Sequence, residues 1–261
     1  MVPGLILRSI QRPAFHARVM DTHRDRIGLL RWSGLRMDTE FMFDRDLGGA
    51  PGFAARNIAL VGCGTIGGHL AKFLGQSGAG HRGRLSLVDP EKLAPGNIGR
   101  HWLGPRHVGA PKAEACRDEI KAAFPHSDVR AHACSILEKL LLLASADLVV
   151  DATGEEAVSI ALNQRLVDRR PSGPAAVHVW LAGNGAAAQC LFVGHKGEEA
   201  CLKCLRPAGA AAATRPDWPL APGAGLREAP AACGEAAFVP YGVAAPAIAA
   251  GLALKVCLGW D

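Results

Sequence analysis

A glycine-rich turn limits what this chain can fold into. An apolar run at residues 57–61 leads into the turn, which reads Gly62-Cys63-Gly64-Thr65-Ile66-Gly67. Residues 66–74 then carry apolar side chains at helical spacing. Glycines between a strand and a helix let the backbone approach a phosphate, to which the first amides of the helix donate. The turn therefore predicts a nucleotide-binding loop, although a tight turn that only packs helix on strand has the same spacing.

A carboxylate stands where a nucleotide-binding fold places one. Residues 84–89 form a second apolar run that ends on Asp89, about twenty residues after the glycine turn. A carboxylate at the end of the second strand accepts hydrogen bonds from ribose hydroxyls. The turn and Asp89 together favour nucleotide binding, without saying which nucleotide.

Strands and helices alternate along most of the chain. This order predicts an α/β fold with a Rossmann-like, doubly wound, mainly parallel sheet and helices on both faces. We expect an N-terminal extension at 1–55 and one domain at 56–261. The predicted strands are 57–62, 84–89, a segment around Val129, 146–151, 175–181 and 187–193, and the predicted helices are 66–74, 111–124, 155–169 and 243–258.

Composition narrows the remaining classes. The net charge of +5 comes without a run of Lys or Arg, so we expect no nucleic-acid partner. Eight Cys in a chain that is 49% hydrophobic do not indicate the disulfide framework of a small secreted domain. We find no signal peptide and no apolar run long enough to cross a bilayer, so we expect a cytoplasmic chain with no membrane partner.

The polar loop that follows Asp89 favours a nucleoside triphosphate over NAD(P) as the ligand. It offers Asn97, Arg100 and Lys112 near the carboxyl edge of the predicted sheet. Cations there could neutralise a triphosphate and the charge that develops as pyrophosphate leaves, and the Asn amide can bond an oxygen. An NAD(P)-dependent oxidoreductase would use the glycine turn and Asp89 but not these three residues. Either cation alone is more simply a solvated surface charge.

These motifs together resemble a known family. Gly-x-Gly-x-x-Gly, Leu-Val-Asp, Asn-x-x-Arg and Val-Gly-x-x-Lys-Ala, in this order, are similar to the adenylation domain of the ThiF/MoeB/HesA family, which includes ubiquitin-activating E1 enzymes. The resemblance covers roughly residues 55–258. It implies an E1-like adenylyltransferase that uses Mg-ATP to activate the C-terminal carboxylate of a protein partner, such as a ubiquitin-like protein, as an acyl-adenylate.

The resemblance also implies roles for single residues. Asp89 would hold the ribose, and Asn97 would hold the phosphates. Arg100 and Lys112 would also hold the phosphates and would take part in catalysis. The family implies a homodimer, with an arginine such as Arg45 or Arg56 reaching across it. The Arg100-His101 pair is closer to the bacterial E1-like proteins of antiphage operons, which implies an E2-like protein as a further partner.

The chain departs from the family at its magnesium position. The family has Asp-x-Thr-Asp, whereas residues 151–154 read Asp-Ala-Thr-Gly. We expect Asp151 to bind Mg²⁺, with Glu155 as the alternative, because Mg²⁺ needs only one or two carboxylates beside ATP and water. Asn163 fits the family asparagine on the following helix. Gly154 is also consistent with a nucleotide-binding scaffold that has lost catalysis.

Two features of the cysteines carry alternatives. Cys201-Leu202-Lys203-Cys204 is half of a four-cysteine zinc site, and Cys233 and Cys257 are the unpaired cysteines that follow it. Zinc needs four Cys or His ligands, so the pair is either part of a zinc site or simply reduced and packed. In the family, a crossover loop, here about residues 205–235, can carry a nucleophilic cysteine. Cys233 could therefore take the acyl group as a thioester, or be a zinc ligand or a buried thiol.

Overall fold

The computed structural model describes residues 11–26, 32–38, 40–47, 51–196, 199–205 and 240–260. The chain divides into two compact units, Met1–Met37 and Asp38–Asp261. The first contains α2 (Pro13–Thr22), with proline in its first turn, and the short 3-10 helix η1 (Arg24–Arg26). The extension at 1–55 and the domain at 56–261 stay predictions. Within the second unit, the Phe53 side chain is 1% exposed and joins the core.

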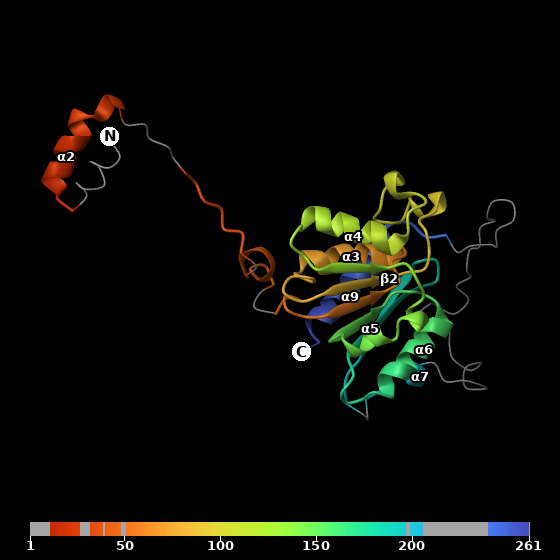
Figure 1. The fold of residues 1–261 in the computed structure, drawn as a ribbon. Helices are drawn as coiled ribbons and strands as arrows, with labels where there is room; N and C mark the ends of the chain where they lie inside the picture. Colours follow the sequence, from red (N-terminus) through yellow and green to blue (C-terminus); the bar gives the residue numbers. More distant parts are fainter. Residues whose placement is uncertain are drawn as a thin grey trace, which may run out of the picture. The chain divides into compact units, whose positions relative to one another are not determined.

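A six-stranded sheet forms the centre of the second unit, in the order β3-β2-β1-β4-β5-β6 (Figure 1). Neighbouring strands run parallel from β3 to β5, and β6 is antiparallel to β5. The predicted Rossmann-like, mainly parallel fold is therefore confirmed. The strands are β1 (Ile58–Val61), β2 (Leu85–Val88), β3 (Val129–His132), β4 (Leu148–Asp151), β5 (Ala175–Ala182) and β6 (Ala187–Val193).

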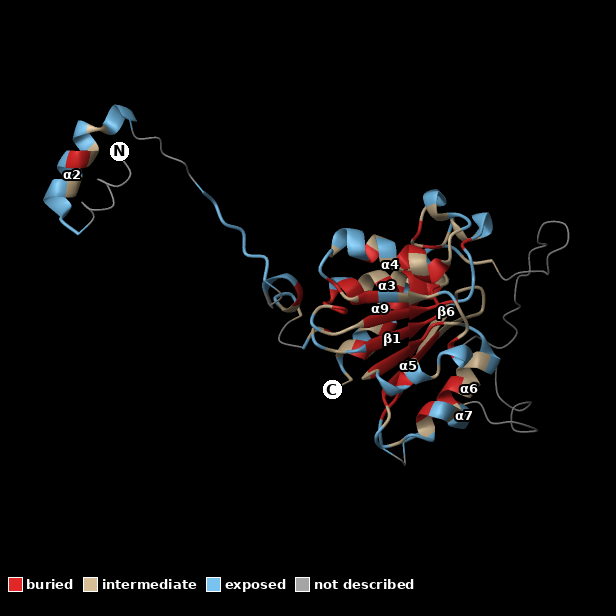
Figure 2. Cartoon of the chain, viewed as in Figure 1, coloured by how far each residue is buried: buried red, intermediate tan, exposed pale blue. Residues whose placement is uncertain are grey.

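Helices cover both faces of this sheet, so its central strands are buried on each side (Figure 2). In β1, Ile58 and Leu60 pack into the core on one face, and Ala59 and Val61 pack into the core on the other. The first face carries α3 (Thr65–Gln76), α4 (Lys112–Ala123) and α9 (Ala244–Leu258), and the second carries α5 (Leu141–Ala144), α6 (Glu156–Val167) and α7 (Leu202–Leu205).

Short helical turns complete the connections. They are the π-helical turn η2 (Glu40–Asp44) and the 3-10 turns η3 (Pro95–Asn97), η4 (Pro105–His107) and η5 (Ile136–Glu138). In the parts of the chain that the structure describes, no helix combines the length and apolar character needed to cross a membrane.

The start of α4 differs from the sequence prediction. Pro111 was expected in the first helical turn, but it is the N-cap residue, with φ −58° and ψ 129°. Its extended backbone forms an antiparallel bridge with Lys92, and the amide of Lys112 donates to the Glu91 carbonyl at 2.9 Å. Pairing with a distant part of the polar loop therefore delays the helix by one residue.

The glycine turn joins β1 to α3 by a close approach of backbone to backbone. Gly62 has φ +88°, a backbone angle that residues with a side chain rarely adopt. A Cβ on Gly67 would lie 1.8 Å from the carbonyl oxygen of Gly62, so only glycine fits there. Gly64 differs, because a Cβ on it would meet nothing within 4 Å. Close packing explains why Gly62 and Gly67 are glycines, but it does not explain Gly64.

Two alanine variants in this turn test the close approach of its backbone. We expect Gly67→Ala to lower the free energy of unfolding by about 3 kcal/mol or to prevent folding, because its Cβ overlaps a backbone oxygen. Gly64→Ala, at the N-cap of α3, is the matched control and should cost no more than about 1 kcal/mol when it is unfolded in urea. Equal stability of the two variants would contradict the close approach.

Candidate active site

A cavity of about 850 Å³ opens at the carboxyl ends of β1, β2 and β4. The strand order reverses at β1, which has β2 on one side and β4 on the other. Ligands of open α/β sheets bind at such a switch point. Gly67 lies inside the turn rather than on the wall. The predicted residues that line the cavity are Gly62, Gly64, Thr65, Ile66, Asp89, Asn97, Arg100, Lys112 and Asp151.

Asp89 ties the glycine turn to the end of β2. Its Oδ2 accepts a 2.6 Å hydrogen bond from the amide of Cys63, and its Oδ1 accepts a 2.7 Å bond from the amide of Glu91. Burial raises the pKa of Asp89, while these two hydrogen bonds favour the charged form. Each carboxylate oxygen has two lone pairs, so Asp89 can hold the turn and still accept bonds from a ribose.

Lys112 brings a buried positive charge to the cavity. It is the first residue of α4 and only 5% exposed, and its Nζ forms an ion pair with Glu91. The Glu91 side chain is 67% exposed, so it can move into solvent and leave the ammonium to a ligand. A buried Lys that exchanges one anion for another suits a site for phosphate groups.

The loop between Asn97 and Leu103 holds two more groups at the site. Asn97 Oδ1 accepts a 3.0 Å bond from the amide of Ala94, so the amide nitrogen of Asn97 is the group it can offer to a ligand. Arg100 reaches the cavity wall, where its Cζ lies 4.7 Å from the ring centroid of Tyr241.

His101 fastens this loop to the glycine turn. Its Nδ1 accepts from the amide of Leu103 at 3.0 Å, so its Nε2 carries the proton and donates to the Cys63 carbonyl at 2.8 Å. Burial lowers the pKa of His101, in keeping with a neutral ring. A Cβ on Gly68 would lie 2.6 Å from His101 Cε1, so the ring needs glycine beside it. In the sequence, His101 stands out only as the neighbour of Arg100, and no local pattern predicts this contact with Cys63.

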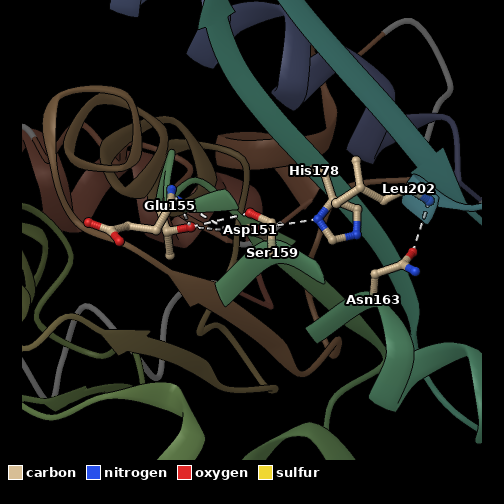
Figure 3. A network of polar contacts seen from close by, with 7 residues as sticks. Asp151, Glu155, Ser159, Asn163, His178 and Leu202 are labelled. Carbon is tan, nitrogen blue, oxygen red and sulfur yellow. Dashed lines mark hydrogen bonds and ion pairs between the residues drawn. The ribbon is translucent and has the colours of Figure 1, made fainter. Parts of the chain in front are cut away.

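A second polar network lies at the end of β4 (Figure 3). Asp151 is 2% exposed; its Oδ2 accepts a 2.8 Å bond from His178 Nδ1, and its Oδ1 accepts a 2.7 Å bond from the Thr153 hydroxyl. Burial by itself raises the pKa of Asp151, but the bonds from His178, Ser159 and Thr153 bring it below its usual value. His178 was not predicted, because only the pairing of β4 with β5 places it opposite Asp151.

This network bears on the magnesium prediction. Asp151 lines the cavity, but both of its carboxylate oxygens already accept hydrogen bonds. Glu155 also lines the cavity, is exposed, and directs its carboxylate away from the Asp151–His178 pair (Figure 3). Gly154 has φ +69°, which favours glycine, and no carboxylate stands at that position. Asp151 and Glu155 therefore both stay predictions as Mg²⁺ ligands, with Glu155 the more accessible.

Cys201 and Cys204 lie at α7, which packs against α6. Cys201 Sγ is 3.8 Å from Cys204 Sγ and accepts a 3.5 Å bond from Asn163 Nδ2. Burial raises the pKa of the Cys201 thiol, but the bond from Asn163 and nearby amides bring it below its ordinary value. Cys257 lies apart, buried in α9, where burial strongly raises its pKa. Cys233 falls outside the described residues.

Within the described ranges, no group of three or more His, Cys, Asp or Glu side chains is placed to hold a metal ion. Zinc at Cys201 and Cys204 therefore stays a prediction. All the cysteines that the structure describes are free thiols.

Comparison with known proteins fits this geometry. A family model described as "ThiF family" matches residues 52–259. The chain belongs to the ThiF family. The match includes every strand of the sheet and every cavity-lining residue named above.

Curated relatives match parts of this chain. An ATP-dependent ubiquitin transferase-like protein Cap2 from Pseudomonas aeruginosa is 38% identical over 174 residues, covering 66% of this chain and 31% of the relative. A protein of the same name from Vibrio cholerae is 34% identical, covering 52% of this chain and 24% of the relative. An adenylyltransferase and sulfurtransferase MOCS3 from Drosophila persimilis is 28% identical, covering 57% and 35%. This chain thus spans about a third or less of their lengths.

Solved structures agree on the fold. The crystal structure of E. coli MccB with ATP has a TM-score of 0.57 at 19% identity, covering 78% of this chain and 55% of MccB. The microcin C7 biosynthetic enzyme MccB in complex with N-formylated MccA has a TM-score of 0.58 at 17% identity and covers 78% of this chain and 56% of MccB. At these identities the likeness concerns the fold alone.

The Asp151–His178 pair makes stability depend on pH. A carboxylate whose pKa is lowered by folding stabilises the fold above its unfolded pKa, and the contribution is lost as the pH falls through the folded value. His178→Leu leaves the buried carboxylate without this partner and should cost about 3 kcal/mol near neutral pH. Without His178, burial raises the pKa of Asp151 in the variant, so the variant takes up a proton at a higher pH than the wild type and regains stability. We therefore expect the gap to narrow as urea unfolding is repeated from about pH 7 to about pH 4. A gap that stays constant or widens toward acid would contradict the pairing.

Proposed function

We propose that this chain is an E1-like adenylyltransferase that uses Mg-ATP to activate the C-terminal carboxylate of a protein partner as an acyl-adenylate. One observation carries the proposal. Asp89, Arg100 and Lys112 face one cavity together with a glycine turn whose Gly64 is left open toward it. A ribose ligand, two cations and free helix amides at one switch point match the parts of a nucleoside triphosphate.

The nucleotide would bind in a defined direction. Its ribose hydroxyls would donate to Asp89, which is already fixed by two backbone amides. Its phosphates would lie over Gly64 and Thr65, at the N-terminus of α3, where backbone amides and the helix dipole favour negative charge. Lys112 would exchange the carboxylate of Glu91 for a phosphate oxygen.

The reaction then needs charge stabilisation more than proton transfer. A carboxylate oxygen of the partner's C-terminus attacks the α-phosphorus, and the bond from that phosphorus to its bridging oxygen breaks. Pyrophosphate leaves with the bonding electron pair. Arg100 and Lys112 stabilise the charge that develops on the leaving group, in a cavity partly shielded from water.

A magnesium ion, when bound, would neutralise phosphate charge and orient the leaving group. The carboxylates offered to it are Glu155, exposed at the wall, and Asp151, buried and hydrogen-bonded to His178. We propose Glu155 as the ligand that reaches the ion most easily, with Asp151 held behind it.

The fate of the acyl-adenylate is a further part of the proposal. Transfer to Cys233 as a thioester, or directly to an acceptor such as an E2-like protein, is supported by the ubiquitin transferase-like name of the Cap2 relatives and by nothing geometric, since Cys233 lies outside the described residues. The same likeness supports a role in antiphage defence. We also propose a homodimer in the cytoplasm.

Two other functions use the same cavity. An NAD(P)-dependent oxidoreductase would use the glycine turn and Asp89, but it would leave Asn97, Arg100 and the buried Lys112 without a role. A nucleotide-binding scaffold without catalysis is favoured by one observation, the glycine at residue 154 in place of a carboxylate. A scaffold would keep partner binding when Lys112 is replaced, whereas the enzyme would lose adenylation.

Two lysines on α4 provide a matched test of ATP binding. Lys112→Ala removes the buried cation and should weaken Mg-ATP binding about 10- to 100-fold by calorimetry, because hydrogen bonds to charged groups contribute about 1.5–3 kcal/mol. Lys121→Ala, exposed at the other end of α4, is the control and should bind as the wild type does. Tight binding of NADH without an ATP signal would favour the oxidoreductase and exclude the proposal.

A further inference from the structure

The chain's single tyrosine lies against a cation of the site. The Cζ of Arg100 is 4.7 Å from the ring centroid of Tyr241, and both residues line the cavity. A guanidinium over an aromatic face is attracted by the ring's negative quadrupole. Held by its flat face, the guanidinium keeps N–H groups at its edge available to phosphate oxygens.

The turn between β5 and β6 packs against Tyr241 and the residue before it. The side-chain Nδ2 of Asn184 donates to the carbonyl of Pro240 at 3.1 Å. Gly185 has φ +77°, and a Cβ on it would lie 3.1 Å from Tyr241 Cβ and 2.6 Å from Ala245 Cβ. The turn therefore packs directly on the start of α9 and fixes where the tyrosine ring stands.

Arg100 is thus fixed at two points. Its backbone belongs to the loop that His101 bonds to the carbonyl of Cys63, and its guanidinium rests over Tyr241. A long arginine side chain loses rotamer entropy when it binds a phosphate, and a prior contact reduces that loss. The ring contact therefore prepares the cation for an anion at this side of the cavity.

We propose that Tyr241 is a positioning residue that orients Arg100 toward the phosphates of the bound nucleotide. The proposal rests on the function proposed above and adds to it a residue from the segment just before α9. Tyr241 acts through Arg100, so its ring should affect ligands with phosphates and leave the nucleoside part unaffected. Phenylalanine should replace it, because the ring and not the hydroxyl carries the contact.

The test compares Mg-ATP and adenosine binding by calorimetry in Tyr241→Leu, Tyr241→Phe and Arg100→Ala. We expect Tyr241→Leu to weaken ATP binding about 3- to 30-fold and adenosine binding less than about 2-fold. Tyr241→Phe should restore wild-type ATP binding. Val243→Ala, an exposed change nearby outside the cavity, is the control. In the Arg100→Ala background, Tyr241→Leu should add no further loss.

Other outcomes overturn the inference. Equal losses for ATP and adenosine would mean that the ring contacts the nucleoside, and full additivity with Arg100→Ala would mean that it acts separately. Wild-type ATP binding in Tyr241→Leu, with weakened binding in Arg100→Ala, would reject the role of Tyr241 but keep the proposed function. No ATP binding by the wild type would reject the function itself. Should Tyr241→Leu fail to fold, Tyr241→Gln gives the same comparison.

Discussion

The backbone of residue 67 passes so near the carbonyl of Gly62 that a Cβ there would be 1.8 Å from the oxygen. That approach fixes how β1 turns into α3 and so where the free amides of the helix lie. Two distant residues then bond to this turn: Asp89 accepts from the amide of Cys63, and His101 donates to its carbonyl. The loop that carries Arg100 and Asn97 is thereby tied to the same backbone.

The cavity that results carries charges of both signs. Arg100 and Lys112 line it together with the carboxylates of Asp89 and Asp151, and Asp151 is bonded to His178. Lys112 is paired with an exposed carboxylate that a polyanion can displace. Cations together with carboxylates suit a ligand with a phosphate chain and a metal ion.

The sequence predicted the parts of this site that depend on local order. The glycine turn and Asp89 follow β1 and β2, Lys112 begins α4, and parallel topology brings such positions together. Arg100 lies in the loop that His101 bonds to the glycine turn. Contacts set by pairing across the sheet were not predictable: His178 meets Asp151 through the register of β4 with β5, and Tyr241 meets Arg100 across 141 positions of sequence. The alternation of apolar residues predicts which face of a strand is buried, but it does not predict which strand pairs with it or in what register. Pro111 was wrongly placed for the same reason, since its bridge to Lys92 is non-local.

Exchange of labelled pyrophosphate into ATP tests carboxylate activation most directly. Small proteins and peptides with free C-terminal carboxylates would be compared with the same molecules amidated at the C-terminus. Reversible formation of an acyl-adenylate predicts magnesium-dependent exchange with at least one carboxylate-ended molecule and none with its amide. Tight ATP binding without exchange for any of them, or equal exchange with the amides, would contradict the proposed activity.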